Sequence, residues 1–339
     1  MKELRNLILL DSAPQKEWNF QQLFEKKTGQ EWKIAHIDSH FSDPGWKKKL
    51  KFFLFPAQVF LQRDRIGAIL SFQQFYGLIF ALYCSIFHVK KRNTLLIVTF
   101  IYRPKKGIAG RLYFHFMKYA VRSRYIDRII CFSKTEPEYY SRLFGVRKEL
   151  FAYVPFAIGD VSPVIKTAGS SEEKFILSAG KSNRDYDFLV DALAETAYPV
   201  RIISDTYKRE EVSGNIRIYG TVYGRDYLKM LAECYCVVVP LADVHISAGQ
   251  FVFLQSMMFG KPVIVTESET VRDYIEDGSN GLIIKKEKNC LLDALKKLYE
   301  DKGLYKAMSD AGKEAYKMEY SLERMAERIG DIYMESLQA

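Results

Sequence analysis

The chain has 339 residues, of which 48% are hydrophobic, 27% charged and 14% aromatic. This composition excludes general disorder, and the length is about twice that of a typical domain, so two packed domains are expected. Residues 1–160 contain 27 Lys and Arg against 13 Asp and Glu, a balance of +14, whereas residues 161–339 contain 23 against 28, a balance of −5. Charge alone does not decide whether the basic half faces nucleic acid, an anionic membrane or a polyanionic substrate.

The five cysteines form no C-x-x-C pair, and most lie in apolar runs, which is typical of reduced, buried thiols in a cytosolic protein. Cys234 and Cys236 have the spacing of a strand, so both are expected on one face of it. No His or further Cys lies at metal-ligand spacing around them, so no metal site is predicted. The segment at the N-terminus, MKELRNLILLDS, has no long apolar region and no small-residue cleavage site, so no export signal is expected.

One uncharged stretch, Ile66 to Phe87, is about as long as a membrane span. Gln73 and Gln74 lie in its middle and Gly77 follows them. A β-branched run followed by a helical run favours a buried strand and then a buried helix, rather than one transmembrane helix.

The segment from Trp46 to Phe55 places a cluster of lysines against large apolar and aromatic side chains. This combination suits the headgroup boundary of an anionic membrane. An ordinary core helix with a solvated lysine face explains the same pattern, so both alternatives stay open.

The first half alternates short apolar runs with amphipathic stretches, which predicts a parallel α/β domain over residues 1–157. Helices are expected at Phe20–Lys27 and Arg111–Arg124. The expected strands are Leu4–Leu10, Lys33–Ile37, Ala68–Ser71, Thr94–Phe100, Arg128–Phe132 and Leu150–Val154. Residues 158–172 are rich in Gly, Pro and Ser without sustained periodicity, which is typical of a linker.

Residues 173–318 repeat this pattern and predict a second parallel α/β domain. The expected strands are Phe175–Ala179, Val200–Ser204, Ile216–Tyr219, Cys236–Pro240, Pro262–Thr266 and Gly281–Ile284. The expected helices are Asp187–Glu195, Tyr227–Glu233, Phe251–Phe259, Val271–Glu276 and Leu291–Tyr299. A helix pair is expected over Leu304–Leu337, with residues 319–339 packing back on the N-terminal domain. Two such domains would face a cleft at the carboxyl ends of their sheets, where ligands of open α/β folds bind.

The segment from Ser178 to Leu193 is an expected strand, a small-residue turn with Gly180, the cations Lys181 and Arg184, and a helix that begins near Asp185. A helix N-terminus that follows a glycine and is flanked by cations suits a phosphate, because free N–H groups add to the point charges. Solvated cations with an aspartate as helix cap explain the same residues.

Two further segments have the same strand, loop and helix arrangement. From Pro240 to Thr266, a polar loop opens a helix near Gly249, and Gly260-Lys261-Pro262 closes it before the next strand. Gly249 would let a ligand approach the backbone closely, and Gln255 offers a donor and an acceptor one helical face onward. The third segment, VRDYIEDGSNGLII, is a short helix, a turn and a strand.

Together these segments resemble the donor-binding domain of the GT-B glycosyltransferases, in particular the large retaining group called family 4 (glycosyl transferases group 1). The family pattern has Gly-Arg with a following Lys, a helix with two glutamates eight residues apart, Met-Ala-x-Gly-Lys-Pro-Val-Ile, and a D-G-x-N-G-L turn. This chain has Gly180-Lys181, Arg184, LQSMMFGKPVI from Leu254 to Ile264, and DGSNGL from Asp277 to Leu282. The similarity covers about residues 173–290.

The resemblance implies a role for each matching position. Lys181 and Arg184 would clamp the diphosphate, beside Gly180. The loop and helix start near the pyrophosphate and sugar would be formed by Ser247, Gly249, Gln250 and Phe251. The nucleotide base would lie at Gly220 to Tyr223, with Val222 and Tyr223 as its neighbours. The segment Ser133-Lys134-Thr135-Glu136 resembles the serine motif of the family's first domain.

The sequence departs from the family where charge would be needed. Gln255 stands at the second glutamate and Ser247 at the first, so neither carboxylate of the pair is present. Gln255 can accept a hydrogen bond from a ribose hydroxyl but supplies no charge to an oxocarbenium-like centre. The first-domain histidine is also missing, with Ile101-Tyr102-Arg103 in its place. His245, in the loop before Gly249, could reach a phosphate or sugar, or could be an ordinary hydrogen-bonded loop histidine.

We therefore expect a GT-B glycosyltransferase of the hexosyltransferase type, retaining and metal-independent, that uses a nucleoside diphosphate sugar and no cofactor. A UDP-sugar is expected rather than a GDP-sugar. The catalytic group is not identified by sequence; Lys181, Arg184 and His245 are the candidates. The acceptor is expected to be a glycan or a lipid-linked glycan of surface polysaccharide assembly, reached from the cytoplasm at the inner membrane face, and no nucleic acid partner is expected. The alternative is a non-catalytic sugar-nucleotide or glycan-binding protein with a degenerate site.

Overall fold

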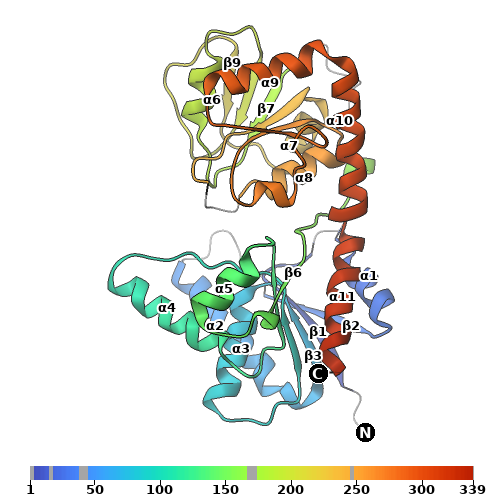
Figure 1. The fold of residues 1–339 in the computed structure, drawn as a ribbon. Helices are drawn as coiled ribbons and strands as arrows, with labels where there is room; N and C mark the ends of the chain where they lie inside the picture. Colours follow the sequence, from blue (N-terminus) through green and yellow to red (C-terminus); the bar gives the residue numbers. More distant parts are fainter. Residues whose placement is uncertain (1–3, 15–17, 38–44, 166–173, 245–247, 339) are drawn as a thin grey trace. The chain divides into compact units, whose positions relative to one another are not determined.

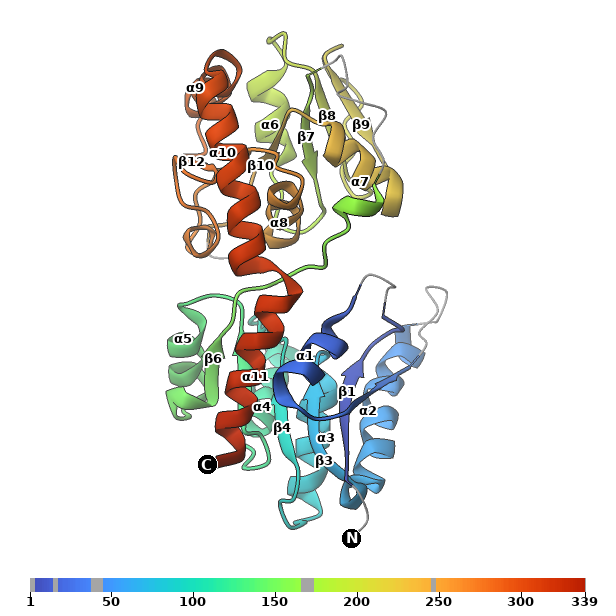
Figure 2. The same ribbon diagram turned by 90° about the vertical axis from the view of Figure 1, so that its right-hand side faces the viewer.

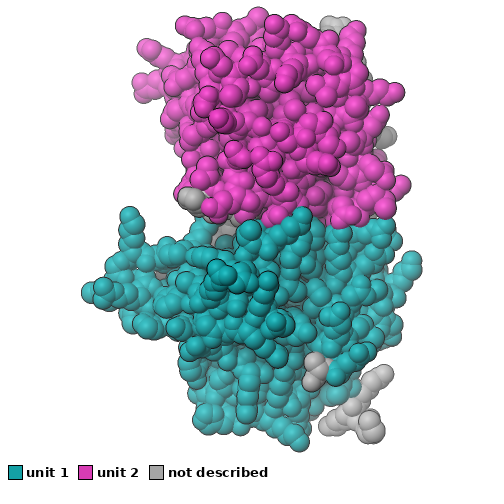
Figure 3. Space-filling model, in the orientation of Figure 1, with its two compact units in different colours: residues 1–155, 322–339 teal, residues 156–321 magenta. Residues whose placement is uncertain are grey.

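A computed structural model describes residues 4–14, 18–37, 45–165, 174–244 and 248–338, and the side chains of residues 45–49 lie outside the description. The chain divides into two compact units (Figures 1 and 3). Unit 1 comprises residues 1–155 and 322–339, and unit 2 comprises residues 156–321. Each unit has a parallel six-stranded sheet with helices, so the expected pair of Rossmann-like α/β domains is confirmed, while the cleft between them stays a prediction.

Unit 1 has the strand order β2-β1-β3-β4-β5-β6, all parallel. Its strands are β1 (Arg5–Leu10), β2 (Trp32–His36), β3 (Ile66–Ser71), β4 (Thr94–Ile97), β5 (Arg128–Cys131) and β6 (Phe151–Tyr153). Its helices are α1 (Phe20–Thr28), α2 (Gly45–Leu61), α3 (Gln74–Ile86), α4 (Gly107–Val121), α5 (Glu136–Phe144) and α11 (Leu322–Gln338). Helices α2 to α5 share one core with the sheet, whereas α1 packs on α11 (Figure 2).

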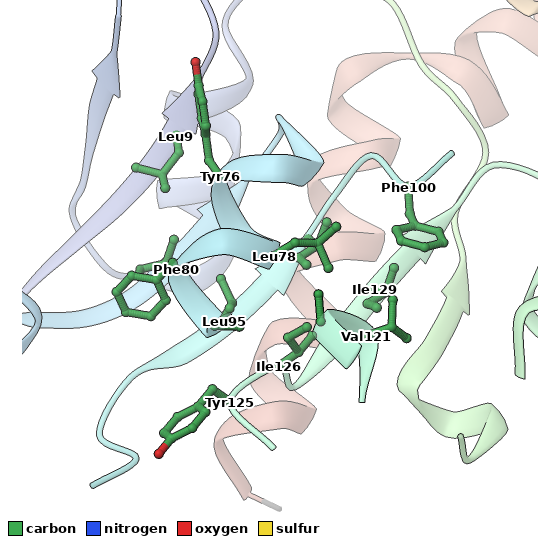
Figure 4. Close-up of a cluster of buried hydrophobic side chains, with 14 of the residues drawn as sticks. Leu9, Tyr76, Leu78, Phe80, Leu95, Phe100, Val121, Tyr125, Ile126 and Ile129 are labelled. Carbon is green, nitrogen blue, oxygen red and sulfur yellow. The ribbon is translucent and has the colours of Figure 1, made fainter. Parts of the chain in front are cut away.

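The core of unit 1 follows from strands that are apolar at nearly every position. Leu9, Leu95 and Ile129 come from three strands of the sheet and lie in one cluster with Phe80 of α3 and Val121 of α4 (Figure 4). Parallel strands covered by helices need apolar side chains on both faces, and this is why they read as continuous hydrophobic runs in the sequence.

The uncharged stretch Ile66 to Phe87 forms strand β3 and helix α3, as predicted. The side chain of Gln73 accepts a hydrogen bond from the N–H of Phe75 (3.2 Å) and caps α3. The glutamine that interrupts the run therefore marks the start of the helix. Among the described residues, no helix is both long and apolar enough to cross a membrane.

The segment from Trp46 to Phe55 lies in α2, and its side chains are described from Leu50 onward. Phe52 contacts the rings of Phe75 and Tyr76, and Phe55 is buried against Tyr76. Phe53 is 45% exposed. One side of this segment thus belongs to the core, and its contact with a membrane stays a prediction.

The C-terminal helix α11 belongs to unit 1 and packs on α1. The ring of Tyr333 meets the ring of Trp32 edge-on, with 5.2 Å between centroids, and its hydroxyl donates to Oε1 of Gln30 (2.7 Å). Asp331 forms an ion pair with Lys27. The last residues of the chain therefore help to complete a core that the first residues begin.

Unit 2 has the strand order β12-β11-β10-β7-β8-β9, again all parallel. Its strands are β7 (Ile176–Ala179), β8 (Val200–Ile203), β9 (Ile216–Tyr219), β10 (Cys236–Val239), β11 (Val263–Thr266) and β12 (Leu282–Ile284). Its helices are α6 (Tyr186–Leu193), α7 (Gly224–Glu233), α8 (Gln250–Met258), α9 (Lys288–Glu300) and α10 (Lys302–Ala315). One face of the sheet packs on α7 and α8, and the other packs on α6, α9 and α10.

Two sequence predictions for unit 2 are wrong. The expected helix Val271–Glu276 is a short 3-10 turn, Val271–Asp273, because the chain turns after Tyr274 to enter β12. Cys234 and Cys236 do not share a face: Cys234 ends α7 and packs with α8, whereas Cys236 lies in β10 and packs with α6 and α9. The strand begins only after Cys234, so the two-residue spacing of these cysteines wrongly predicted a shared face. All five cysteines are free, and Cys290 alone is partly exposed.

Candidate functional site

The candidate site lies at the carboxyl edge of the unit 2 sheet, between β7 and β10. From β7 the chain continues outward through β8 and β9, whereas β10 leads outward through β11 and β12 on the other side. The loops that follow β7 and β10 therefore diverge, and such a switch point is where ligands of open α/β sheets bind. The segments Gly180–Asp185 and Leu241–Gly249 are these two loops.

The loop after β7 needs its glycine. Gly180 has φ +113°, and a Cβ there would lie 2.9 Å from Nη2 of Arg184. The hydroxyl of Tyr186 donates to the carbonyl of Gly180, and the carboxylate of Asp185 accepts from the N–H of Phe188 (3.0 Å) as the cap of α6. The close approach of the guanidinium to the backbone thus depends on the absence of a side chain at position 180.

Arg184 is the central cation of the site. Its Nε donates to the carbonyl of Ala179 (3.1 Å) and its Nη1 to the carbonyl of Ser182 (2.8 Å). No carboxylate of the described residues forms an ion pair with it. Burial lowers the pKa of Arg184, but a guanidinium keeps its proton at any physiological pH. A partly buried positive charge without a counter-charge favours an anionic ligand.

Lys181 has a different environment from Arg184. Its ammonium binds Oδ2 of Asp205 (2.9 Å), which also accepts a hydrogen bond from the hydroxyl of Tyr223 (2.6 Å). Hydrogen bonds from Tyr223 and Lys181 lower the pKa of Asp205, and Asp205 in turn raises the pKa of Lys181. All three side chains lie at the ends of β7, β8 and β9, so this network connects the diphosphate and base positions that the resemblance implies.

Asn183 ties the two loops of the switch point together. Its side-chain amide donates to the carbonyl of Asp243 (2.9 Å) and accepts from the N–H of the same residue (2.8 Å). Asn183 has φ +56°, a left-handed conformation that asparagine tolerates better than most residues. Lys286 adds a second connection, since its ammonium binds Asp185 and the carbonyl of Ala242, each at 3.0 Å. Residues 242 and 243 of the second loop are therefore held against the first loop without a ligand.

Helix α8 begins at this edge without a side-chain cap among the described residues. The residue before it, Gly249, has φ +97°, and a Cβ there would overlap the ring of Phe253 and lie 3.2 Å from Val239. Arg184 forms a bridge with Leu241, two residues after Val239, so the helix start and the guanidinium lie along the same end of β10. Uncapped N–H groups and the helix dipole favour an anion at such a position.

Gln255 is buried on α8, with 6% of its surface exposed, and its Oε1 accepts a hydrogen bond from the hydroxyl of Tyr227 (2.9 Å). Burial raises the pKa of Tyr227, and the nearby charge of Arg184 opposes this rise. Tyr227 therefore binds the amide and is close enough to the guanidinium to feel its charge. The position of the second family glutamate is occupied by a neutral group that a tyrosine already holds.

The remaining predicted residues are spread along the same edge. Gly220 and Tyr223 are exposed after β9, and Val222 packs on the core beside α8. Phe251, in the first turn of α8, is 53% exposed. Gln250 is the first residue of α8. His245 and Ser247 lie outside the described residues.

Two segments of unit 1 lie where the family has motifs, and both form hydrogen bonds between a side chain and the backbone. Glu136 accepts hydrogen bonds from the N–H groups of Phe132 and Ser133, each at 3.0 Å, at the start of α5. In the segment that replaces the missing histidine, Ile101 donates to Oε1 of Gln74 (2.9 Å) and accepts from its Nε2 (3.2 Å). Tyr102 is buried, and Arg103 is exposed.

Within the described part of the chain, no group of three or more His, Cys, Asp or Glu side chains could hold a metal ion. Metal independence itself stays a prediction. Sequence reasoning missed Asp205 and Tyr227, which hold Lys181 and Gln255. Asp205 directly follows the expected strand Val200–Ser204, so the rule that ligands lie at the carboxyl ends of strands could have found it. Tyr227 carried no sequence signal, because a tyrosine on an amphipathic helix is usually a core residue.

Known proteins share this architecture. A family model for glycosyl transferases group 1 matches residues 203–315. An uncharacterized glycosyltransferase of Methanocaldococcus jannaschii, MJ1178, is 26% identical over 240 residues, which are 68% of this chain and 64% of that protein. The alignment thus spans less than two thirds of this relative's length.

Solved structures of the same fold cover nearly the whole chain. Alr3699/HepE of Anabaena, in complex with UDP and glucose, has a TM-score of 0.70 at 16% identity and covers 98% of this chain and 100% of its own. WaaG, a glycosyltransferase involved in lipopolysaccharide biosynthesis, has a TM-score of 0.64 at 15% identity and covers 96% and 99%. Residues 203–315 thus match the glycosyl transferases group 1, and the chain as a whole has the GT-B fold of these glycosyltransferase structures.

Proposed function

We propose that this protein is a glycosyltransferase that binds a nucleoside diphosphate sugar at the carboxyl edge of unit 2 and transfers the sugar to a glycan or lipid-linked acceptor. The observation that carries the proposal is Arg184, a partly buried cation without a carboxylate partner among the described residues, at the same end of β10 as the start of α8. A departing diphosphate is the ligand that such a pair of features would stabilise most.

The donor in this proposal is a UDP-sugar. Alr3699/HepE, whose fold is the same, was solved with UDP, with UDP and glucose, and with UDP-glucose. Arg184 and Lys181 would bind the diphosphate, and the segment Gly220–Tyr223 would lie against the base. The ammonium of Lys181 would exchange Asp205 for a phosphate oxygen, which costs little because exposed ion pairs are weak.

The reaction would be driven by position and electrostatics, without a metal and with retention of the anomeric configuration. Arg184 and the N–H groups of α8 would neutralise charge on the leaving diphosphate while the acceptor hydroxyl is held against the anomeric carbon. The basic first half would hold the acceptor. A lipid-linked glycan at the cytoplasmic face of the membrane, in surface polysaccharide assembly, suits this charge, and WaaG, which has the same fold, is involved in lipopolysaccharide biosynthesis.

A second candidate function is sugar-nucleotide or glycan binding without turnover. The pairing of Gln255 with Tyr227 favours it, because the buried amide supplies no negative charge to an oxocarbenium-like centre. Release of UDP from a UDP-sugar, with or without an added acceptor, would exclude this candidate.

The first experiment is thermal unfolding of the purified chain with UDP, GDP, ADP, CMP and their sugar conjugates. A ligand that binds only the folded state raises the midpoint, and we expect the largest rise with UDP or a UDP-sugar. The double variant Lys181→Ala/Arg184→Ala should keep its unliganded midpoint and lose this rise. An unchanged rise in the double variant would contradict the site, and no rise with any nucleotide would contradict the donor.

A further inference from the structure

The outer face of helix α4 in unit 1 combines exposed apolar side chains with cations. Ile108 is 78% exposed and Leu112, one turn later, 67% exposed, which are among the most exposed large apolar side chains described. Tyr119, two further turns along the same face, is 56% exposed. Residues at such spacing form one stripe along a helix.

The cations of α4 lie beside this stripe. Arg111 and Lys118 are seven residues apart and fall on the flank of the face that holds Ile108 and Leu112. Lys105 and Lys106 precede the helix and are exposed. The helix itself contains no acidic residue.

The absence of acidic residues extends well beyond α4. No Asp or Glu occurs between Asp64 and Asp127, although this part of the sequence contains eleven Lys and Arg. An ordinary solvated surface mixes both signs of charge. A face with one sign of charge and exposed apolar side chains is complementary to an anionic lipid surface, whose headgroups attract the cations while the apolar side chains enter the acyl boundary.

The loop before α4 is fixed against the helix. A Cβ at Gly110 would overlap the carbonyl of Lys105, so the loop packs directly on the first turn. The ammonium of Lys105 lies 4.4 Å from the ring centre of Tyr113. In Figure 1 this loop and the start of α4 lie at the outer side of unit 1, and Figure 3 shows the same part as a projection. Ile108 is therefore presented to solvent by a structured element.

The cationic character continues at the other end of α4. A cavity of about 670 Å³ is lined there by Arg122, Arg124 and Arg147, among other residues. Of the lining residues, Asp127 is the one acid, and its carboxylate already binds Lys91 (2.6 Å) and the N–H of Leu95 (2.9 Å). A phosphate headgroup would find three arginines at this position.

We infer that the outer face of α4, from Lys105 to Arg124, docks unit 1 on an anionic lipid membrane. The choice of a lipid-linked acceptor rests on the proposed function, but the docking surface rests on α4 alone. Nucleic acid would match the cations but leaves Ile108 and Leu112 without a role. The inference assigns membrane contact to α4 rather than to α2, where Phe52 and Phe55 are held by the core.

The test is co-sedimentation of the full chain with vesicles of phosphatidylcholine alone and of phosphatidylcholine with phosphatidylglycerol, at low and at high salt. We expect binding to the anionic vesicles alone, weakened by salt. The variant Ile108→Ser/Leu112→Ser should bind them about tenfold more weakly, because two apolar side chains no longer enter the interface. The variant Arg111→Gln/Lys118→Gln should lose about as much and show less salt dependence.

Two matched variants separate α4 from other surfaces. Leu337→Ser removes an exposed apolar side chain (46% exposed) from α11 and should bind as the wild type does. Phe53→Ser/Leu54→Ser tests α2, and we expect a smaller loss than for α4. None of the substituted side chains is buried, so unfolding midpoints should match the wild type.

The inference is overturned if wild-type protein does not bind anionic vesicles, or if the α4 variants bind as tightly as wild type. It is also overturned if only the α2 variant loses binding, if α4 mediates a dimer in light scattering without lipid, or if a single-stranded oligonucleotide binds through Arg111 and Lys118 more tightly than the vesicles. The UDP-dependent midpoint, measured on the same samples, separates the two proposals. Vesicle binding without a UDP effect would contradict the proposed donor and leave the docking surface standing.

Discussion

The carboxyl edges of the two sheets differ in how their polar side chains are used. In unit 1, Gln74 is paired with the backbone of Ile101, and Glu136 holds the N–H groups that follow β5. In unit 2, Arg184 donates to two carbonyls but has no carboxylate partner in the described part of the chain. Two sheets of the same architecture thus differ in the partners of these polar side chains. The shared fold only positions a site, and the charge of Arg184 is the reason why we propose the anionic ligand at the edge of unit 2.

Arg184, the cation that sets unit 2 apart, should give the strongest response to substitution. Arg184→Ala should weaken UDP binding by about 100-fold, because charge-assisted hydrogen bonds to phosphate in a partly buried site are lost. The measurement is calorimetric titration with UDP. Arg217→Ala, which removes an exposed arginine from β9, is the matched control and should change the affinity by less than about twofold. Equal effects of the two substitutions would mean that general charge, and not the site, attracts the nucleotide.

The next largest effect is expected when the glycine at the start of α8 is replaced, because its backbone conformation is strained for other residues. Gly249→Ala should lower the free energy of unfolding by about 1–3 kcal/mol, because φ +97° is strained for alanine and the new Cβ overlaps Phe253. UDP binding should weaken as well, since the helix start moves. Chemical denaturation of Gly249→Ala and Gly214→Ala measures this. Gly214 has no neighbouring atom within 4 Å of the point where a Cβ would lie, so it should tolerate alanine.

A smaller effect is expected at the corresponding edge of unit 1. Gln74→Ala removes two hydrogen bonds to Ile101 and should cost about 1 kcal/mol of stability while leaving UDP affinity unchanged. Gln58→Ala, at an exposed position of α2, is the control for loss of a glutamine side chain. A loss of UDP affinity in Gln74→Ala would show that the edge of unit 1 also takes part in donor binding and would remove the contrast between the units.

The fold could be predicted from sequence because both sheets are parallel and buried. Each strand, from Arg5–Leu10 to Leu282–Ile284, is a short apolar run within two or three residues of its expected bounds. Periodicity failed where a segment is short: Val271–Glu276 has helical spacing, but only one 3-10 turn forms before the chain enters β12. Periodicity also failed at Cys234, which ends α7 and lies two residues before the start of β10.

The site could be predicted only in part. Gly180, Lys181, Arg184 and Gly249 could be proposed as site residues because glycines and cations at strand ends have a local signature. The partners of Lys181 and Gln255 were missed because they come from other elements: Asp205 follows Lys181 by 24 residues, and Tyr227 precedes Gln255 by 28. A contact over such a separation depends on the order of the strands, which local patterns do not contain.

The smallest change in UDP affinity is expected on substitution of Asp205. This substitution tests the difference between Lys181, which has a carboxylate partner, and Arg184, which has none among the described residues. Asp205→Asn should raise UDP affinity about two- to fivefold at neutral pH, because the ammonium of Lys181 no longer exchanges a carboxylate for a phosphate oxygen. Hydrogen bonds from Tyr223 and Lys181 lower the pKa of Asp205, so in the wild type the carboxylate stays charged at neutral and mildly acidic pH. The affinity difference should therefore persist from neutral to mildly acidic pH and close only below that range. Asp293→Asn, at an exposed position of α9, should leave the affinity unchanged throughout. A weaker affinity in Asp205→Asn would mean that Asp205 holds Lys181 in its binding position, and that the ion pair is part of the site rather than a competitor for it.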